Sequence, residues 1–188
     1  MHMRTIICFL LAVSGIAAQT DPGNRLTFSG AWSTQVGGYA YAPKEDAAGF
    51  GLSYGHRILR FVEAEAGLFT ALDPTANVCT KFGCQDLDDR YYWVPFGVRF
   101  IAPTYLGRIE LSGGGGGLYE KYTVGNSSVC CYAAHDGWGG YFVGSVSVAL
   151  DRSRRFWLSG TPRWFLANGT YARDRWFQIA GEVSYRFR

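Results

Sequence analysis

Apolar and polar residues alternate in steps of two along most of this chain, and this pattern constrains its fold more than any other feature. In the last segment Phe177, Val183 and Phe187 fall in one phase, whereas Gln178 and Glu182 fall in the other. Successive side chains of a β-strand point to opposite faces, so this alternation is typical of strands. The same pattern recurs in seven earlier segments, at 26–38, 48–56, 60–70, 90–101, 108–122, 138–150 and 155–166. Eight strands are therefore predicted.

The connections between these segments alternate in length. Short connections are predicted at His56–Arg60, Ala102–Gly107 and Asp151–Arg154. Longer ones are predicted at Tyr41–Ala47, Ala71–Asp89, Thr123–Gly137 and Ala167–Asp174. Up-and-down membrane barrels have short turns at one end and longer loops at the other. The predicted fold is therefore an all-β, eight-stranded antiparallel up-and-down transmembrane β-barrel, with both chain ends at the short-turn end.

The distribution of charge indicates which face of the strands meets the apolar phase. A soluble barrel hides its apolar face inside and carries charge outside, and a membrane barrel reverses this arrangement. The chain has only three lysines, of which Lys44 and Lys81 fall in loops and Lys121 at the end of a strand. The polar faces are mostly Gly, Ser, Thr and Ala, although a solvated surface should be much more densely charged. A membrane barrel is therefore favoured over a secreted soluble ligand-binding barrel.

Residues 1–18 have the three parts of a signal peptide. Arg4 supplies the positive charge, an apolar run extends from Ile6 to Val13, and small residues allow cleavage after Ala17 or Ala18. This apolar run is too short to span a bilayer as a helix. We therefore expect export, followed by a barrel domain over residues 19–188.

The cysteines fit an exported protein. Removal of the predicted signal peptide leaves an even number of them, Cys79, Cys84, Cys130 and Cys131. Disulfides are favoured over a metal site because the spacings are not those of zinc motifs. Four cysteines allow three pairings, which are the local pair Cys79–Cys84 and two sets of links between the loops. The spacing does not choose between them.

Alternation also assigns several charged residues to the interior of the barrel. An eight-stranded barrel is just wide enough for its own side chains to fill. An ion-pair network that closes the lumen is therefore predicted, since a buried charge requires a partner. The alternatives are a gated ion path and a paired-carboxylate acid–base site. The residues assigned to this network are Glu63, Glu65, Arg99, Glu110, Arg163, Glu182 and Arg186.

Three further features lead to expectations about the strands. Aromatic residues near the predicted outer strand ends suit an interfacial girdle, namely Tyr39, Tyr41, Tyr91, Tyr92, Trp93, Tyr122, Trp138, Tyr141 and Trp176. Pro95 and Pro162 are expected at bulges or near the rim, because proline cannot donate to the strand ladder. The glycine run Gly113–Gly117 is expected to leave room for bulky inward neighbours.

The chain resembles the OmpA/OmpX-like outer-membrane β-barrel superfamily over roughly residues 24–188. The resemblance is carried by the strand–turn spacing, by Val94–Phe100, by the Gly113–Gly117 run and by the closing Val183–Phe187. It implies a barrel that contacts outer-membrane lipid, is inserted by the outer-membrane assembly machinery and resides in the bacterial outer membrane. One departure is Arg188, which follows Phe187 where the family usually ends on an aromatic residue.

A non-enzymatic role is predicted, either structural or in surface interaction through the outer loops, whose ligand is unknown. The runner-up is a lipid A-modifying enzyme, for which His135 is a better candidate than His56 because it lies in an outer loop, near Ser127 and Ser128. No cofactor or metal site is predicted. Nucleic-acid binding is not expected, since the longest basic run is Arg154-Arg155.

Overall fold

The computed structural model describes residues 23–36, 46–72, 75–80, 83–102, 108–124, 133–167 and 175–188. None of these segments forms a helix long and apolar enough to cross a membrane. The strands are β1 (Asn24–Gln35), β2 (Asp46–Leu59), β3 (Val62–Leu72), β4 (Thr75–Thr80), β5 (Gly83–Ala102), β6 (Ile109–Val124), β7 (Ala133–Ala149), β8 (Phe156–Ala167) and β9 (Arg175–Phe187).

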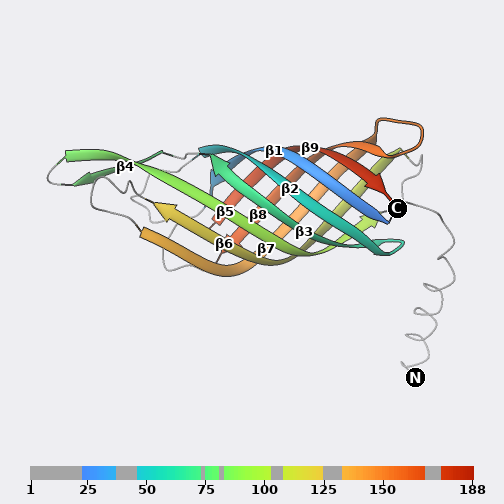
Figure 1. Cartoon of the computed structure of the whole chain (residues 1–188), viewed down its shortest axis with the longest axis horizontal. Helices are drawn as coiled ribbons and strands as arrows, with labels where there is room; N and C mark the ends of the chain where they lie inside the picture. The colour runs from blue at the N-terminus through green and yellow to red at the C-terminus, as the bar shows by residue number, and fades with distance from the viewer. Residues whose placement is uncertain are drawn as a thin grey trace, which may run out of the picture.

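Eight of these strands form a closed antiparallel barrel. Neighbours along the chain pair with each other, β3 pairs with β5, and β1 pairs with β9 to close the wall. The first described residues of β1 and the end of β9 lie together at the end that carries the short turns (Figure 1). The structure thus confirms the predicted eight-stranded up-and-down fold.

The remaining strand, β4, lies outside the barrel wall. β4 pairs only with the first part of β5, and together they form a hairpin that extends beyond the opposite end of the barrel (Figure 1). The connection 71–89, predicted as a loop, therefore contains a hairpin. His56, predicted in a turn, lies within β2 opposite Asn24, and the turn itself is only Arg60 and Phe61. Both differences arise because strand pairing continues beyond the residues in which apolar and polar side chains clearly alternate.

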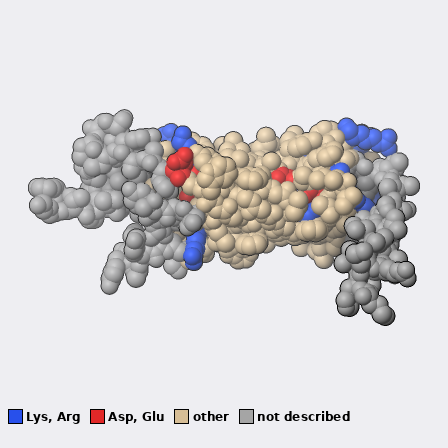
Figure 2. Space-filling view, turned by 90° about the horizontal axis from the view of Figure 1, so that it is seen from below, with Lys and Arg blue, Asp and Glu red and all other residues tan. Residues whose placement is uncertain are grey.

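The two faces of the wall differ sharply in chemistry. In β9, Ile179 and Val183 are exposed on the outside, whereas Gln178, Glu182 and Arg186 are buried inside. The other barrel strands repeat this division, and a broad band of the outer surface carries little charge (Figure 2). The outer face is apolar and the inner face is polar and aromatic, which is the arrangement of a membrane barrel.

The two prolines lie within the barrel wall, and each interrupts the pairing of its strand with one neighbour. Between β3 and β5 the pairing passes from Ala66↔Phe96 to Phe69↔Trp93, which omits Pro95. The same register holds on both sides of the gap, so no bulge is present. Pro162 leaves an equivalent gap between β7 and β8. The expectation of bulges or rim positions was wrong, because the missing N–H of a proline can be tolerated by omitting one pairing.

The glycine run allows β5 and β6 to approach closely and makes room for a ring on the outer face. The expectation of room for bulky inward neighbours was wrong. A Cβ on inward-facing Gly114 or Gly116 would overlap a backbone carbonyl oxygen of β5. A Cβ on outward-facing Gly117 would overlap the Phe96 ring, which is itself on the outer face. The backbones of β5 and β6 therefore approach too closely for inward side chains here. Room for a bulky inward ring is instead made by Gly51 in β2, which faces Phe69.

Candidate functional site

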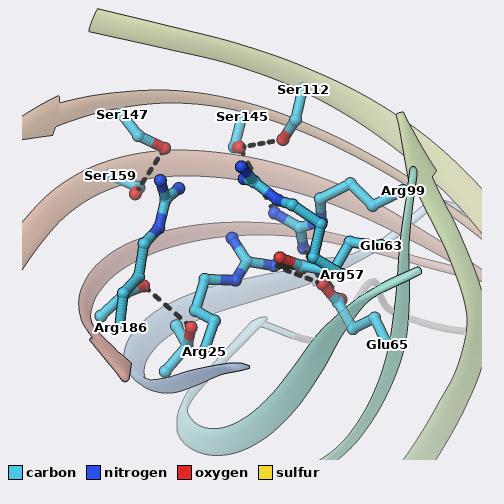
Figure 3. Close-up of polar contacts among 12 residues, drawn as sticks. Arg25, Arg57, Glu63, Glu65, Arg99, Ser112, Ser145, Ser147, Ser159 and Arg186 are labelled. Carbon is cyan, nitrogen blue, oxygen red and sulfur yellow. Dashed lines mark hydrogen bonds and ion pairs between the residues drawn. The ribbon is translucent and has the colours of Figure 1, made fainter. Parts of the chain in front are cut away.

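The interior of the barrel contains a charged layer centred on Glu65. Arg25 Nη2 lies 2.5 Å from Glu63 Oε1 and 2.8 Å from Glu65 Oε2. Arg99 Nη2 lies 2.6 Å from the same Glu65 oxygen, and its Nη1 donates to Ser145 Oγ at 3.3 Å. These side chains come from β1, β3, β5 and β7 and converge inside the wall (Figure 3). Glu65 therefore joins two arginines from different strands.

A second charged group lies across the interior and is built from β8 and β9. Arg163 pairs with Glu182, and Arg163 Nη1 donates to Gln178 Oε1 at 3.2 Å. Thr161 Oγ1 donates to the other Glu182 oxygen at 2.7 Å. The Arg163 guanidinium also lies 4.3 Å from the centre of the Phe69 ring, a cation–π distance. This group thus connects the charged layer to an aromatic one.

A third group lies toward the short-turn end. Arg186 Nη2 is 2.6 Å from Glu110 Oε1, and Arg57 Nη2 is 3.8 Å from Glu110 Oε2. The Arg186 guanidinium stacks 4.0 Å from the centre of the Trp157 ring. One carboxylate and one indole therefore hold two arginines at this opening of the barrel.

The other half of the interior is filled by aromatic rings. Trp93 stacks on Phe165 at 5.0 Å, and Trp176 meets Tyr91 edge-on at 4.8 Å. The Trp93 indole N–H donates to Glu120 Oε2 at 2.6 Å, so this buried carboxylate has a partner. These aromatic side chains are almost completely buried. Side chains thus occupy the described interior, with a charged layer toward the short-turn end and an aromatic layer toward the opposite end.

The aromatic layer corrects the prediction of a girdle. Five of the residues predicted to face lipid point inward instead, and they are Tyr91, Trp93, Tyr122, Tyr141 and Trp176. Tyr92 and Trp138 do face outward, and Tyr39 and Tyr41 lie outside the described residues. The signal was present in the sequence, because Tyr91 and Trp93 are in the same phase as Arg99.

Comparison with known proteins identifies the architecture. No protein-family model matches the chain, and no curated protein sequence matches it. Among solved structures, Neisserial surface protein A has a TM-score of 0.69 and 12% identity, covering 90% of this chain and 100% of that one. The fold is that of the small outer-membrane β-barrels.

Other outer-membrane barrels of this type show the same likeness. OprG from Pseudomonas aeruginosa has a TM-score of 0.68 and 11% identity, covering 89% of this chain and 97% of that one. Ail from Yersinia pestis, in complex with the heparin analogue sucrose octasulfate, has a TM-score of 0.59 and 15% identity. That match covers 88% of this chain and 99% of Ail.

All seven charged residues predicted for the interior are buried inside the barrel. They contribute to the three groups described above. Sequence reasoning missed Arg25, Arg57 and Glu120. Arg25 could have been found, because it precedes Thr27, Ser29 and Ser33 in the same phase of β1.

The residues considered for catalysis do not form a site in the described part of the barrel. His56 is exposed on the outer face, and its Nδ1 lies 3.0 Å from Asn24 Oδ1. The side chain of His135, as well as residues Ser127, Ser128, Cys130 and Cys131, lies outside the described residues. Among the side chains that are described, no three His, Cys, Asp or Glu residues are grouped as a metal site.

Proposed function

We propose that this protein spans the bacterial outer membrane as a sealed barrel. Its role would be structural or in surface interaction through its outer end, without catalysis and without transport through the lumen. The observation that carries this proposal is the filling of the interior by paired charges in one half and packed rings in the other. An eight-stranded barrel has little room beyond such side chains.

The outer surface supports placement in a membrane. Large apolar side chains are about half exposed around the whole wall, for example Phe28, Leu52, Phe100, Val146 and Ile179. A soluble barrel with so much apolar exposure would aggregate, whereas lipid chains solvate it. We propose that residues 1–18 direct export and that the outer-membrane assembly machinery inserts the barrel, with the short-turn end in the periplasm.

Conductance across a planar lipid bilayer tests the sealed lumen. The reconstituted protein is expected to show no stable conductance steps, because paired charges and packed rings occupy the two halves of the described interior. Its folded state is checked beforehand by gel mobility with and without boiling in detergent. Reproducible unitary steps from folded protein, still present in the lipid-facing control Trp32→Ala, would contradict a sealed barrel.

We also propose a disulfide between Cys79 and Cys84 in the outer hairpin. The backbone register places these two residues directly opposite each other. The Cα atoms of such cross-strand pairs lie about 4.5–5.5 Å apart, within the range that a disulfide spans. A bridge here would brace the hairpin and reduce the entropy lost when it binds a partner.

Peptide mapping of the exported protein without reduction tests this pairing. A peptide pair linked through Cys79 and Cys84 is expected, and the Cys79→Ser variant should lose it. A link from either residue to Cys130 or Cys131 would refute the local pairing and select one of the links between loops.

A further inference from the structure

Arginines are concentrated outside the barrel wall at the short-turn end. Six exposed arginines lie there, in the β2–β3 turn, at the start of β6, in the β7–β8 turn and at the C-terminus. Positive side chains gather at this end in the space-filling view (Figure 2). We call them the arginine ring, and its members are Arg60, Arg108, Arg152, Arg154, Arg155 and Arg188.

Protein carboxylates do not neutralise the arginine ring within the described residues. None of its members forms an ion pair there. The acid nearest to it in sequence, Asp151, accepts hydrogen bonds from the Ser153 hydroxyl and from the Phe156 amide, the latter at 2.8 Å. These bonds hold the pKa of Asp151 at about 2, below its ordinary value. Asp151 is thus engaged within its own turn.

The opposite end of the barrel is different. Its exposed cations Arg90, Lys121 and Arg175 are accompanied by the exposed acids Asp46 and Asp136. Both signs of charge are therefore exposed at the outer rim, whereas at the short-turn end the six exposed arginines outnumber the half-buried Asp151. A field of one sign attracts a partner of the opposite sign.

The arginine ring lies at the edge of the apolar belt. Four of its members adjoin large apolar side chains that are exposed on the outer wall, and these are Leu59, Ile109, Phe156 and Phe187. In a membrane barrel, the boundary between the apolar belt and water is the level of the lipid headgroups. Arginine suits this position because its stem packs on apolar groups while its guanidinium binds phosphate through two hydrogen bonds.

The backbone conformation of Arg154 is unusual for an arginine and is a second observation about this end of the barrel. Its φ of 56° lies in the left-handed region, where glycine or asparagine is favoured in a hairpin turn. The Arg154 carbonyl accepts a hydrogen bond from Trp157 Nε1 at 2.7 Å. The Arg154 side chain itself is exposed. An arginine here strains the turn and adds one more charge to the arginine ring.

We propose that the arginine ring binds the phosphate groups of anionic phospholipids in the periplasmic leaflet. This inference rests on the proposed placement in the membrane and adds a lipid preference at one end of the barrel. Lipid is favoured over a soluble acidic partner because the arginine ring is continuous with the apolar belt. Such binding would fix the depth of the barrel in the bilayer.

Lipid selectivity measured by electron spin resonance tests the proposal. The full-length exported protein is reconstituted in phosphatidylcholine vesicles containing spin-labelled phosphatidylglycerol or spin-labelled phosphatidylcholine. The wild type is expected to prefer phosphatidylglycerol, and high salt should weaken the preference. The inner triple variant Arg152→Gln, Arg154→Gln and Arg155→Gln should reduce the relative association constant severalfold, toward one.

The matched control is the outer triple variant Arg90→Gln, Lys121→Gln and Arg175→Gln, which removes the same charge at the other end. It should keep most of the wild-type preference. Equal losses in the two triple variants, or no wild-type preference, would overturn the inference. So would displacement of the labelled lipid by millimolar inorganic phosphate, which would indicate a site for free anions. Failure to insert into vesicles would instead contradict the proposed membrane placement.

The variant Arg154→Gly separates lipid binding from folding. It should relieve the strained backbone and unfold no more easily than the wild type in urea, while showing a lower preference for phosphatidylglycerol. A variant that merely folds badly cannot give this combination. Loss of stability together with an unchanged lipid preference would overturn the role assigned to Arg154.

Discussion

Replacing Glu65 with alanine is expected to lower the free energy of unfolding by about 3–5 kcal/mol. Glu65 is the carboxylate that Arg25 and Arg99 share, and all three side chains are buried. Its removal leaves Arg99 without the carboxylate partner found 2.6 Å away and leaves Arg25 with Glu63 alone. Urea unfolding in lipid vesicles, followed by tryptophan fluorescence, measures the change.

The control for this prediction is Asp46→Ala, which removes an exposed carboxylate from β2 at the other end of the barrel. Its effect should stay within about 0.5 kcal/mol, as for most surface substitutions. The double variant Glu65→Ala, Arg99→Ala should be less destabilised than the sum of the single variants, because it no longer leaves the Arg99 charge unpaired. A Glu65→Ala variant as stable as Asp46→Ala would show that the charged layer contributes little to the barrel.

Substituting Gly116 with alanine should prevent the barrel from closing or destabilise it by about 3 kcal/mol or more. The added Cβ would overlap the carbonyl oxygen of Phe96 on the paired strand. A flexible side chain could move away, but here β5 itself would have to shift. The fraction of protein that shows a heat-dependent gel mobility after refolding into detergent measures the loss.

The same glycine run supplies the matched control for Gly116. Gly113 faces outward, and a Cβ there would meet only Val143 O at 3.8 Å, an ordinary contact. A Cβ at Gly181 would meet nothing within 4 Å. Gly113→Ala and Gly181→Ala should therefore fold as well as the wild type. Equal folding of Gly116→Ala would show that β5 and β6 do not approach as closely as described.

Local alternation was enough to predict the barrel, because a strand buried on one face repeats its chemistry every two residues. The same rule assigned Glu65, Arg99 and Glu182 to the interior, where the structure places them. It could not predict which charges pair, since Arg25 and Glu65 are 40 residues apart and meet only when the wall closes. The grouping of the charges depends on which strands face one another across the interior, and no local pattern records that.

The aromatic layer shows where alternation was not followed far enough. Tyr91 and Trp93 share the phase of Arg99, yet aromatic residues near strand ends were assigned to the lipid interface. Both locations suit an aromatic ring, so residue type alone could not decide between them. The prolines Pro95 and Pro162 indicated an interrupted ladder, but whether the register continues past them depends on pairing between strands, which a single strand does not record.

The assignment of the two faces of the wall is the central claim, and fluorescence quenching by brominated phospholipids tests it most directly. Two single-tryptophan variants are needed, one keeping Trp32, which is 57% exposed on the outer wall, and one keeping Trp93, which is fully buried inside. We expect strong quenching of Trp32 and little quenching of Trp93 in vesicles. Stronger quenching of Trp93 than of Trp32, or recovery of the folded protein from the periplasm without detergent, would contradict a transmembrane barrel with a sealed interior.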